Sequence, residues 1–296
     1  MELCRTVAEL RARVNAARAD GRRVALVPTM GALHAGHLSL VAEARRRADL
    51  VVVSIFVNPT QFAPNEDLAS YPRTPESDLA QCREAGVDVV FAPAPAELYP
   101  SGAQTWVEVA ELSQPLCGTS RPHFFRGVAT VVTKLLVAAQ PHVAVFGEKD
   151  YQQLQVVRRL ARDLLIDVEI VGVATDREPD GLARSSRNVY LDAAMRPEAL
   201  ALVRALDDAE KAVAAGERRV AVLEARVREL LARAPHAEID YAEIRDAATL
   251  AAIETLRAPA VLALAVRFPA PRAASGHVRL IDNRVLLPQR SSGDPR

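Results

Sequence analysis

Pro28-Thr29-Met30-Gly31-Ala32-Leu33-His34-Ala35-Gly36-His37 joins two segments of different character. Residues 22–27 before it form a short apolar run that is typical of a strand. Residues 38–46 after it are apolar at helical spacing and end in arginines. The pattern predicts a strand, a glycine-containing turn and a helix. In a parallel sheet such a turn lies at the carboxyl end of the strand, where open α/β sheets bind ligands.

The residues of this turn indicate contact with phosphate. Gly31 and Gly36 have no Cβ, so a ligand can approach the backbone closely. His34 and His37 bracket Gly36, and a helix expected to begin near His37 would direct its dipole at the same place. Two imidazoles and a helix N-terminus suit a triphosphate. The spacings of the P-loop and of the G-x-G-x-x-G fingerprint are absent, and a metal pair or two incidental loop histidines remain alternatives.

Composition and charge exclude several classes of protein. Half of the 296 residues are hydrophobic, and Lys plus Arg equals Asp plus Glu at 37 each, so there is no basic surplus of the kind that nucleic-acid binding requires. Cys4, Cys82 and Cys117 are too few and too far apart for a disulfide framework and are expected to be reduced. No apolar run reaches the roughly 18 residues of a membrane span, and residues 1–10 lack the apolar core of a signal peptide. The sequence therefore predicts a soluble, cytoplasmic protein.

Strand and helix patterns alternate along residues 1–175, which predicts an α/β domain with a Rossmann-like parallel sheet. The lone tryptophan, Trp106, is expected in its core. Residues 176–288 have a different pattern, with Ala-, Arg- and Glu-rich helices followed by strands, and predict a smaller α+β lid domain. Residues 289–296 are expected to form a disordered tail.

Further polar residues follow strands that are expected to end at the same edge of the sheet. Asn58 and Gln61 follow the apolar run 50–57. Lys149 and Asp150 lie in the loop 147–150 that follows the run 141–146, with ordinary surface residues as the alternative. Gln61 is the better ligand candidate by location, whereas turn-filling is an equal alternative for Asn58. Two hydroxyls and a guanidinium in Ser185-Ser186-Arg187 suit the β- and γ-phosphates of ATP, with a solvated linker as the alternative.

Five motifs in order resemble the pantoate–β-alanine ligase (pantothenate synthetase) family of the HIGH nucleotidyltransferase superfamily. They are residues 28–37, Phe56-Val57-Asn58-Pro59-Thr60-Gln61-Phe62, Tyr71-Pro72-Arg73-Thr74, Gly147-Glu148-Lys149-Asp150-Tyr151-Gln152-Gln153 and the stretch from Asp180 to Asn188. The resemblance implies ATP-dependent condensation of (R)-pantoate with β-alanine through a pantoyl adenylate. It also implies release of AMP and pyrophosphate, Mg²⁺ and a homodimer. The balanced charge and the lack of a long apolar run separately predict no nucleic-acid or membrane partner.

The resemblance also assigns roles to residues of this chain. His37 corresponds to the residue usually assigned as proton donor, and His34 and Lys149 are expected to assist it. Gln61 is expected between pantoate and β-alanine and Gln153 at pantoate, with Asn58 and Tyr71 as further substrate-binding residues. The residues expected to bind ATP are Met30, Gly31, Ala32, Leu33, His34, Ala35, Gly36, His37, Gly147, Glu148, Lys149, Asp150, Asp176, Arg184, Ser185, Ser186 and Arg187.

Two positions depart from the family pattern. Members of the family usually have Met or Leu at the position of Arg184, and an apolar residue or Thr at the position of Asp176. One interpretation is that Arg184 adds positive charge to the pyrophosphate site. A nucleotidylyltransferase that stops at an adenylated or cytidylylated product remains the alternative enzyme, and a nucleotide-sensing module remains the non-enzymatic one.

Overall fold

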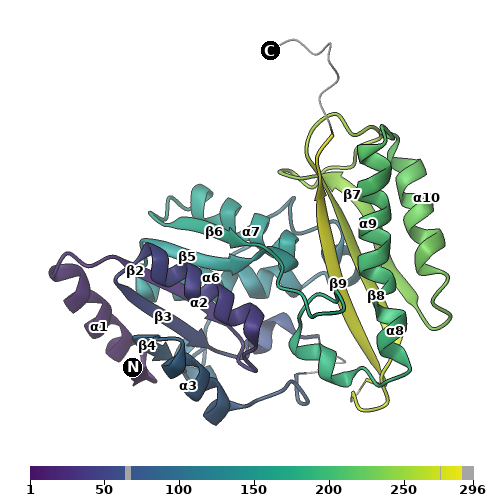
Figure 1. The fold of residues 1–296 in the computed structure, drawn as a ribbon. Coiled ribbons are helices and arrows are strands. Elements are labelled where there is room, and N and C mark those ends of the chain that lie inside the picture. The colour runs from purple at the N-terminus through teal and green to yellow at the C-terminus, as the bar shows by residue number, and fades with distance from the viewer. Residues whose placement is uncertain (64–67, 274, 289–296) are drawn as a thin grey trace. The chain divides into compact units, whose positions relative to one another are not determined.

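The computed structural model describes residues 1–63, 68–273 and 275–288 in two compact units (Figure 1). The first unit comprises residues 1–114, 121–176 and 184–186, and the second comprises residues 115–120, 177–183 and the chain from residue 187 onward. Two parts of the sequence lie outside the described residues. One is the tail predicted for residues 289–296, and the other includes Asp67, which is close to Tyr71 in the sequence. No helix in the described part of the chain is long and apolar enough to cross a bilayer.

A six-stranded, all-parallel sheet forms the centre of the first unit, in the order β1-β4-β3-β2-β5-β6. The strands are β1 (Glu2–Cys4), β2 (Val24–Thr29), β3 (Leu50–Ile55), β4 (Val89–Phe91), β5 (Val143–Gly147) and β6 (Glu169–Val173). The central strands are buried along almost their whole length, which explains why they are continuous apolar runs. The order reverses between β2 and β5, and this creates a topological switch point.

Helices cover this sheet. They are α1 (Val7–Ala19), α2 (Ala35–Arg47), α3 (Pro75–Glu84), α4 (Pro95–Leu98), α6 (Phe124–Ala139) and α7 (Tyr151–Asp163), with short 3₁₀ turns η1 (Pro59–Gln61) and η2 (Glu148–Asp150). Side chains of α2 and α3, among them Leu40, Val41 and Cys82, share one core with alternate residues of β2 and β3. The predicted α/β class is confirmed, but α2 begins at Ala35, two residues before the expected start at His37.

A capping box begins α1, because Thr6 accepts the Glu9 N–H and Glu9 accepts the Thr6 N–H. The predicted burial of Trp106 is wrong. Its side chain is 45% exposed, and the Arg126 guanidinium lies 4.9 Å from its ring. A single aromatic residue carries no periodicity, so the sequence could not show which side of the segment packs.

An antiparallel sheet of three strands, β7 (Glu238–Asp246), β8 (Ala260–Pro269) and β9 (His277–Leu286), forms the second unit (Figure 1). The helices α9 (Ala201–Ala214) and α10 (Val220–Leu231) pack beside each other and against the sheet. The unit also contains α5 (Cys117–Ser120), η3 (Ser186–Tyr190, whose first residue falls in the first unit) and α8 (Met195–Ala199). Its buried core is separate from that of the parallel sheet. Cys4, Cys82 and Cys117 are all buried and free, as predicted.

Candidate active site

The loops that follow β2 and β5 lie on either side of the switch point of the parallel sheet. Residues 30–34 follow β2, and Glu148–Asp150 follow β5, its neighbour in the sheet. The loop 56–61 follows β3, which pairs with β2 on the other side. The polar residues predicted to share one edge therefore follow adjacent strands, because parallel strands present their carboxyl ends at the same edge.

The loop after β2 places His34 and His37 face to face. Gly31 and Ala32 have positive φ angles of 79° and 50°, so the chain turns sharply before His34, which is the N-cap of α2. The His34 and His37 rings stack with their centroids 4.0 Å apart. The buried Nδ1 atoms of both have no hydrogen-bond partner within residues 1–63, 68–273 and 275–288. Buried polar atoms without a hydrogen-bond partner are uncommon, so these two nitrogens indicate that a bound ligand supplies the missing hydrogen bonds.

Burial keeps both imidazoles neutral at pH 7. Burial, and then the positive charges of Lys149 and Arg184, lower the pKa of His34 to about 4, against an opposing effect of Asp176 and Asp150. Burial, followed by His34 and Lys149, lowers the pKa of His37 to about 3. Each ring at neutral pH therefore presents one N–H donor and one acceptor nitrogen.

The loop after β3 positions Gln61 next to Met30. Asn58 is almost fully buried, and its Nδ2 donates to Gln61 Oε1 at 3.0 Å and to the Gly127 carbonyl at 3.1 Å. Gln61 Nε2 in turn lies 3.1 Å from Met30 Sδ. The Asn58 amide is thus bonded within the protein, and this geometry indicates that Asn58 acts by holding Gln61.

Helix α6 approaches this loop through a glycine. A Cβ on Gly127 would lie 2.4 Å from the Thr60 carbonyl oxygen and 2.9 Å from the Gln61 nitrogen, so no larger residue fits. Arg121, just before α6, donates from its guanidinium to the Gln61 carbonyl at 3.0 Å. In this structure Arg121 and Gly127 support the loop that carries Gln61.

Tyr71 and Ser186, which are 115 positions apart, lie together in the first unit. The Tyr71 hydroxyl is 3.4 Å from Ser186 Oγ, and the Tyr71 ring is buried against Phe62 in an edge-to-face contact. The third and fifth sequence motifs therefore meet.

Lys149 and Asp150 form a loose ion pair of 3.8 Å in η2. Gly147 before them has no described atom within 4 Å of the position that a Cβ would take. Packing within the described chain therefore does not require a glycine at this position. Gln153 is half-buried in the first turn of α7.

The two positions that depart from the family pattern are paired with each other. Arg184 Nε lies 2.5 Å from Asp176 Oδ2, and the Arg184 N–H donates to the Asp176 carbonyl at 2.9 Å. Asp176 also lies beside His34 and His37, because its Cβ is 3.6 Å from the position that a Cβ on Gly36 would take. The carboxylate therefore offsets the positive charge that Arg184 brings near His34.

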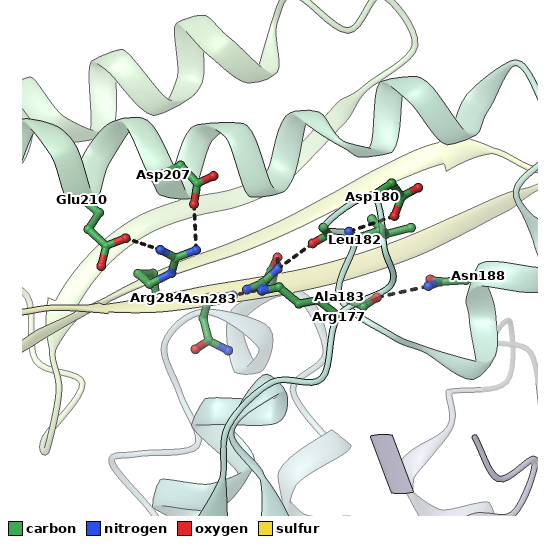
Figure 2. Close-up of polar contacts among 11 residues, drawn as sticks. Arg177, Asp180, Leu182, Ala183, Asn188, Asp207, Glu210, Asn283 and Arg284 are labelled. Atoms are coloured by element: carbon green, nitrogen blue, oxygen red, sulfur yellow. Dashed lines mark hydrogen bonds and ion pairs between the residues drawn. The ribbon is translucent and has the colours of Figure 1, made fainter. Parts of the chain in front are cut away.

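Within the second unit, the residues around the Asp180–Asn188 motif are bonded to β9 and to each other (Figure 2). Arg177 makes a two-pronged ion pair with Asp282 of β9, at 2.7 and 2.9 Å. Asn188 donates to the Ala183 carbonyl at 3.1 Å, which closes the motif on itself (Figure 2). Ser185 and Ser186 belong to the first unit and Arg187 to the second.

Sequence reasoning missed Asp78 of α3. Its side chain is 1% exposed, and its carboxylate accepts the backbone N–H groups of Ala32 and Leu33 at 3.0 and 2.8 Å. An acidic residue in a first helical turn is common for reasons of helix dipole alone, so the sequence carried no signal for this role. Among the residues that the structure describes, no cluster of three or more His, Cys, Asp or Glu side chains could hold a metal ion.

Stacked neutral imidazoles and a lysine at the switch point of a parallel sheet define a nucleotide-binding enzyme of the α/β class. The family model described as Pantoate-beta-alanine ligase matches residues 2–285. The chain belongs to the pantoate-beta-alanine ligase family, and it is a ligase that joins pantoate to β-alanine.

Named relatives cover almost the whole chain. The pantothenate synthetase of Syntrophobacter fumaroxidans is 52% identical over 288 residues, which are 97% of this chain and 99% of that protein. The pantothenate synthetase of Myxococcus xanthus is 53% identical over 292 residues, 98% of this chain and 97% of that protein. The resemblance seen in the five motifs is confirmed.

Solved structures agree. Pantothenate synthetase from Thermus thermophilus superposes with a TM-score of 0.90 at 47% identity, over 97% of this chain and all of that one. Pantoate-beta-alanine ligase from Francisella tularensis, complexed with beta-gamma ATP and beta-alanine, has a TM-score of 0.72 at 31% identity, over 96% of this chain and 97% of that one. The predicted fold, a Rossmann-like domain with a smaller α+β domain, is confirmed.

Proposed function

We propose that this ligase works in two steps, with ATP as the activating substrate and a pantoyl adenylate as the intermediate. The observation that carries the proposal is the pair of stacked, neutral histidines beside Lys149, whose buried Nδ1 atoms lack partners in the described chain. The nucleotide and β-alanine bound in the Francisella tularensis relative support the choice of substrates.

In the first step a pantoate carboxylate oxygen attacks the α-phosphorus of ATP. The bond from that phosphorus to the bridging oxygen breaks, and pyrophosphate leaves with its electron pair. Negative charge grows on the α-phosphoryl oxygens in the transition state. Neutral His34 and His37 donate N–H hydrogen bonds to these oxygens, and Lys149 supplies a positive charge. The proton-donor role implied for His37 is here donation of a hydrogen bond, since its pKa of about 3 leaves no imidazolium to give up a proton at pH 7.

In the second step the β-alanine amine attacks the acyl carbon of the adenylate. The new C–N bond forms, the bond to AMP breaks, and the amine loses a proton. Gln61 serves both steps from between pantoate and β-alanine, with Gln153 at pantoate and Tyr71 in the wall of the site. Because acyl adenylates hydrolyse readily, residues 176–288 act as a lid that excludes water.

The remaining ATP contacts come from the loops at the switch point and from the fifth motif. Residues 30–37 and 147–150 hold the adenosine and the α-phosphate, and Asp176 with Arg184–Arg187 faces the other phosphates. Mg²⁺ would be held chiefly by the phosphates of ATP and would offset their charge, since no group of three or more His, Cys, Asp or Glu side chains among the described residues could hold a metal ion. We further propose a homodimer in the cytoplasm, and sedimentation equilibrium of the purified chain tests the dimer.

Product analysis tests the function. The full chain is incubated with ATP, Mg²⁺ and (R)-pantoate, with and without β-alanine. AMP, pyrophosphate and pantothenate that form at a rate rising steeply with β-alanine would support the ligase mechanism. Pyrophosphate release that ignores β-alanine would favour a nucleotidylyltransferase. ATP binding without turnover would favour a nucleotide-sensing module.

A further inference from the structure

Helix α3 holds the histidine loop (residues 30–34) in place through two side chains that lie one turn apart. Asp78 Oδ2 accepts the Ala32 N–H at 3.0 Å, and Asp78 Oδ1 accepts the Leu33 N–H at 2.8 Å and the Thr74 hydroxyl at 3.0 Å. Gln81 Nε2 donates to the Leu33 carbonyl at 3.3 Å. The two residues are three positions apart, so they lie on the same face of the helix.

The loop needs these partners because of its backbone conformation. Ala32 has a φ of 50°, a region that an L residue with a Cβ disfavours. The Ala32 and Leu33 N–H groups follow β2 and precede α2, so neither belongs to a strand ladder or a helix. The two oxygens of one carboxylate satisfy both groups at once, which holds the chain in the left-handed turn.

The fit around Asp78 is tight. A Cβ on Gly31 would lie 2.9 Å from Asp78 Oδ2 and 3.1 Å from Ile55 Cγ2, so only glycine lets the loop sit this close to the carboxylate. Three residues after Gly31, His34 becomes the N-cap of α2 and stacks on His37. The position of both imidazoles therefore depends on the turn that Asp78 fixes.

We propose that Asp78 is a positioning residue of this ligase: it acts through the Ala32 and Leu33 N–H groups to set the stacked arrangement of His34 and His37. It touches the loop and not the substrate. The inference rests on the proposed function for its kinetic consequence, but its structural consequence for the histidines stands independently of it.

The test compares Asp78→Asn with Asp88→Asn in the full chain. Asparagine keeps the shape of Asp78, but it has one acceptor oxygen and turns an NH₂ donor toward one of the two N–H groups. Asp88 also accepts a backbone N–H, that of Val51 at 2.8 Å, but at the amino-terminal edge of the sheet, so it is a matched control. We expect Asp78→Asn to lower kcat/KM for ATP roughly 10- to 100-fold, the usual effect of a small misplacement of catalytic groups. For Asp88→Asn we expect kcat/KM for ATP to stay within about twofold of the value for the unmodified chain.

A second readout separates positioning from general loss of structure. The imidazole proton resonances of His34 and His37 are expected to shift in Asp78→Asn. Those of His142, whose Nδ1 accepts the Val24 N–H at the far edge of the sheet, are expected to stay in place. Thr74→Val is the second variant, to be used if Asp78→Asn does not fold. It removes the hydroxyl that donates to Asp78, and no helix cap is lost because the Thr74 side chain makes no capping hydrogen bond. It is expected to shift the same two histidines with a smaller loss of kcat/KM.

Unchanged His34 and His37 resonances in a folded variant would overturn the proposal, as would kcat/KM within twofold of the unmodified chain. An equal kinetic loss in Asp88→Asn would also overturn it. If the unmodified chain itself shows no β-alanine-dependent release of AMP, the proposed function fails, and the histidine resonances still decide the role of Asp78.

Discussion

His37 is the residue on which the proposed chemistry depends most. Replacing it with alanine removes one N–H donor from the growing charge on the α-phosphate, so we expect His37→Ala to lower kcat by ~10²–10³. His142→Ala is the control, because His142 bonds to the Val24 backbone at the other edge of the sheet. Steady-state kinetics with saturating ATP measure both. Activity of His37→Ala within threefold of the unmodified chain would contradict the assigned role.

The low pKa values of the two histidines also predict how stability depends on pH. Both groups have native pKa values of about 4 and about 3, below an unfolded value near 6.5, so unfolding takes up protons in this window. Their contribution to stability is complete above pH 6.5 and is lost as the pH falls toward 4. The slope is about 1.4 kcal/mol per pH unit for each group.

Urea unfolding at pH 7 and pH 5 measures this effect. We expect the double variant His34→Asn/His37→Asn to lose less stability between the two pH values than the unmodified chain does, because neither replacement titrates. Equal losses in the two proteins would show that the histidines are not held neutral by burial.

Arg184 and Asp176 are expected to matter as a pair. Arg184→Met alone leaves the Asp176 carboxylate uncompensated beside the triphosphate site, so we expect KM for ATP to rise about five- to tenfold, a change of the size that coupled neighbours show. Adding Asp176→Thr removes that charge and is expected to bring KM back to within about threefold.

A double-mutant cycle of KM values measures the coupling between Arg184 and Asp176. An unchanged KM in Arg184→Met would dismiss a role of Arg184 in ATP binding. Strictly additive effects of the two substitutions would show that the ion pair does not link them.

At the scale of elements, the contact between α6 and η1 sets the position of Gln61. We expect Gly127→Ala to destabilise the protein by about 1–3 kcal/mol, the usual cost of overpacking, because the new methyl meets the backbone of Thr60 and Gln61. The displaced loop is also expected to raise KM for pantoate or β-alanine. Val137→Ala, at an exposed position of the same helix, should change neither quantity. Thermal unfolding and steady-state kinetics check both, and normal KM values in Gly127→Ala would mean that Gln61 does not depend on this contact.

Elements at the carboxyl edge of the sheet divide the work of the site. The loop after β2 carries the histidines, the turn after β5 carries Lys149, and the loop after β3 carries Gln61. Helices α3 and α6 contact no reacting group in the proposed mechanism, yet each holds one of these loops in place.

At the scale of the whole molecule, the chain has two separate buried cores, one in each unit. Leu264→Ala empties part of the core around β8 and is expected to cost about 2–5 kcal/mol. We expect amide hydrogen exchange to accelerate more in β7, β8 and β9 than in β2 and β5. Val27→Ala in β2 should give the reverse pattern. Equal acceleration in both units after either substitution would show that the two cores unfold as one.

The sequence alone determined the α/β class, and it placed the two histidines, Lys149 and Gln61 in segments that follow strands. These features depend on patterns within short stretches, such as the apolar run of β3 or the glycines and histidines of residues 31–37. The three widely spaced cysteines predicted no disulfide framework, and all three are free in the structure. The start of α2 was predicted at His37, two residues from its observed start at Ala35.

Only the tertiary structure decided which distant residues support the site. Asp78 lies 45 positions from Leu33, Gly127 lies 69 from Asn58, and Ser186 lies 115 from Tyr71. It also paired Arg184 with Asp176 and left Trp106 exposed. Strand order and helix packing create such contacts, and hydrophobic periodicity along the chain encodes the buried face of an element but not the neighbour that will cover it.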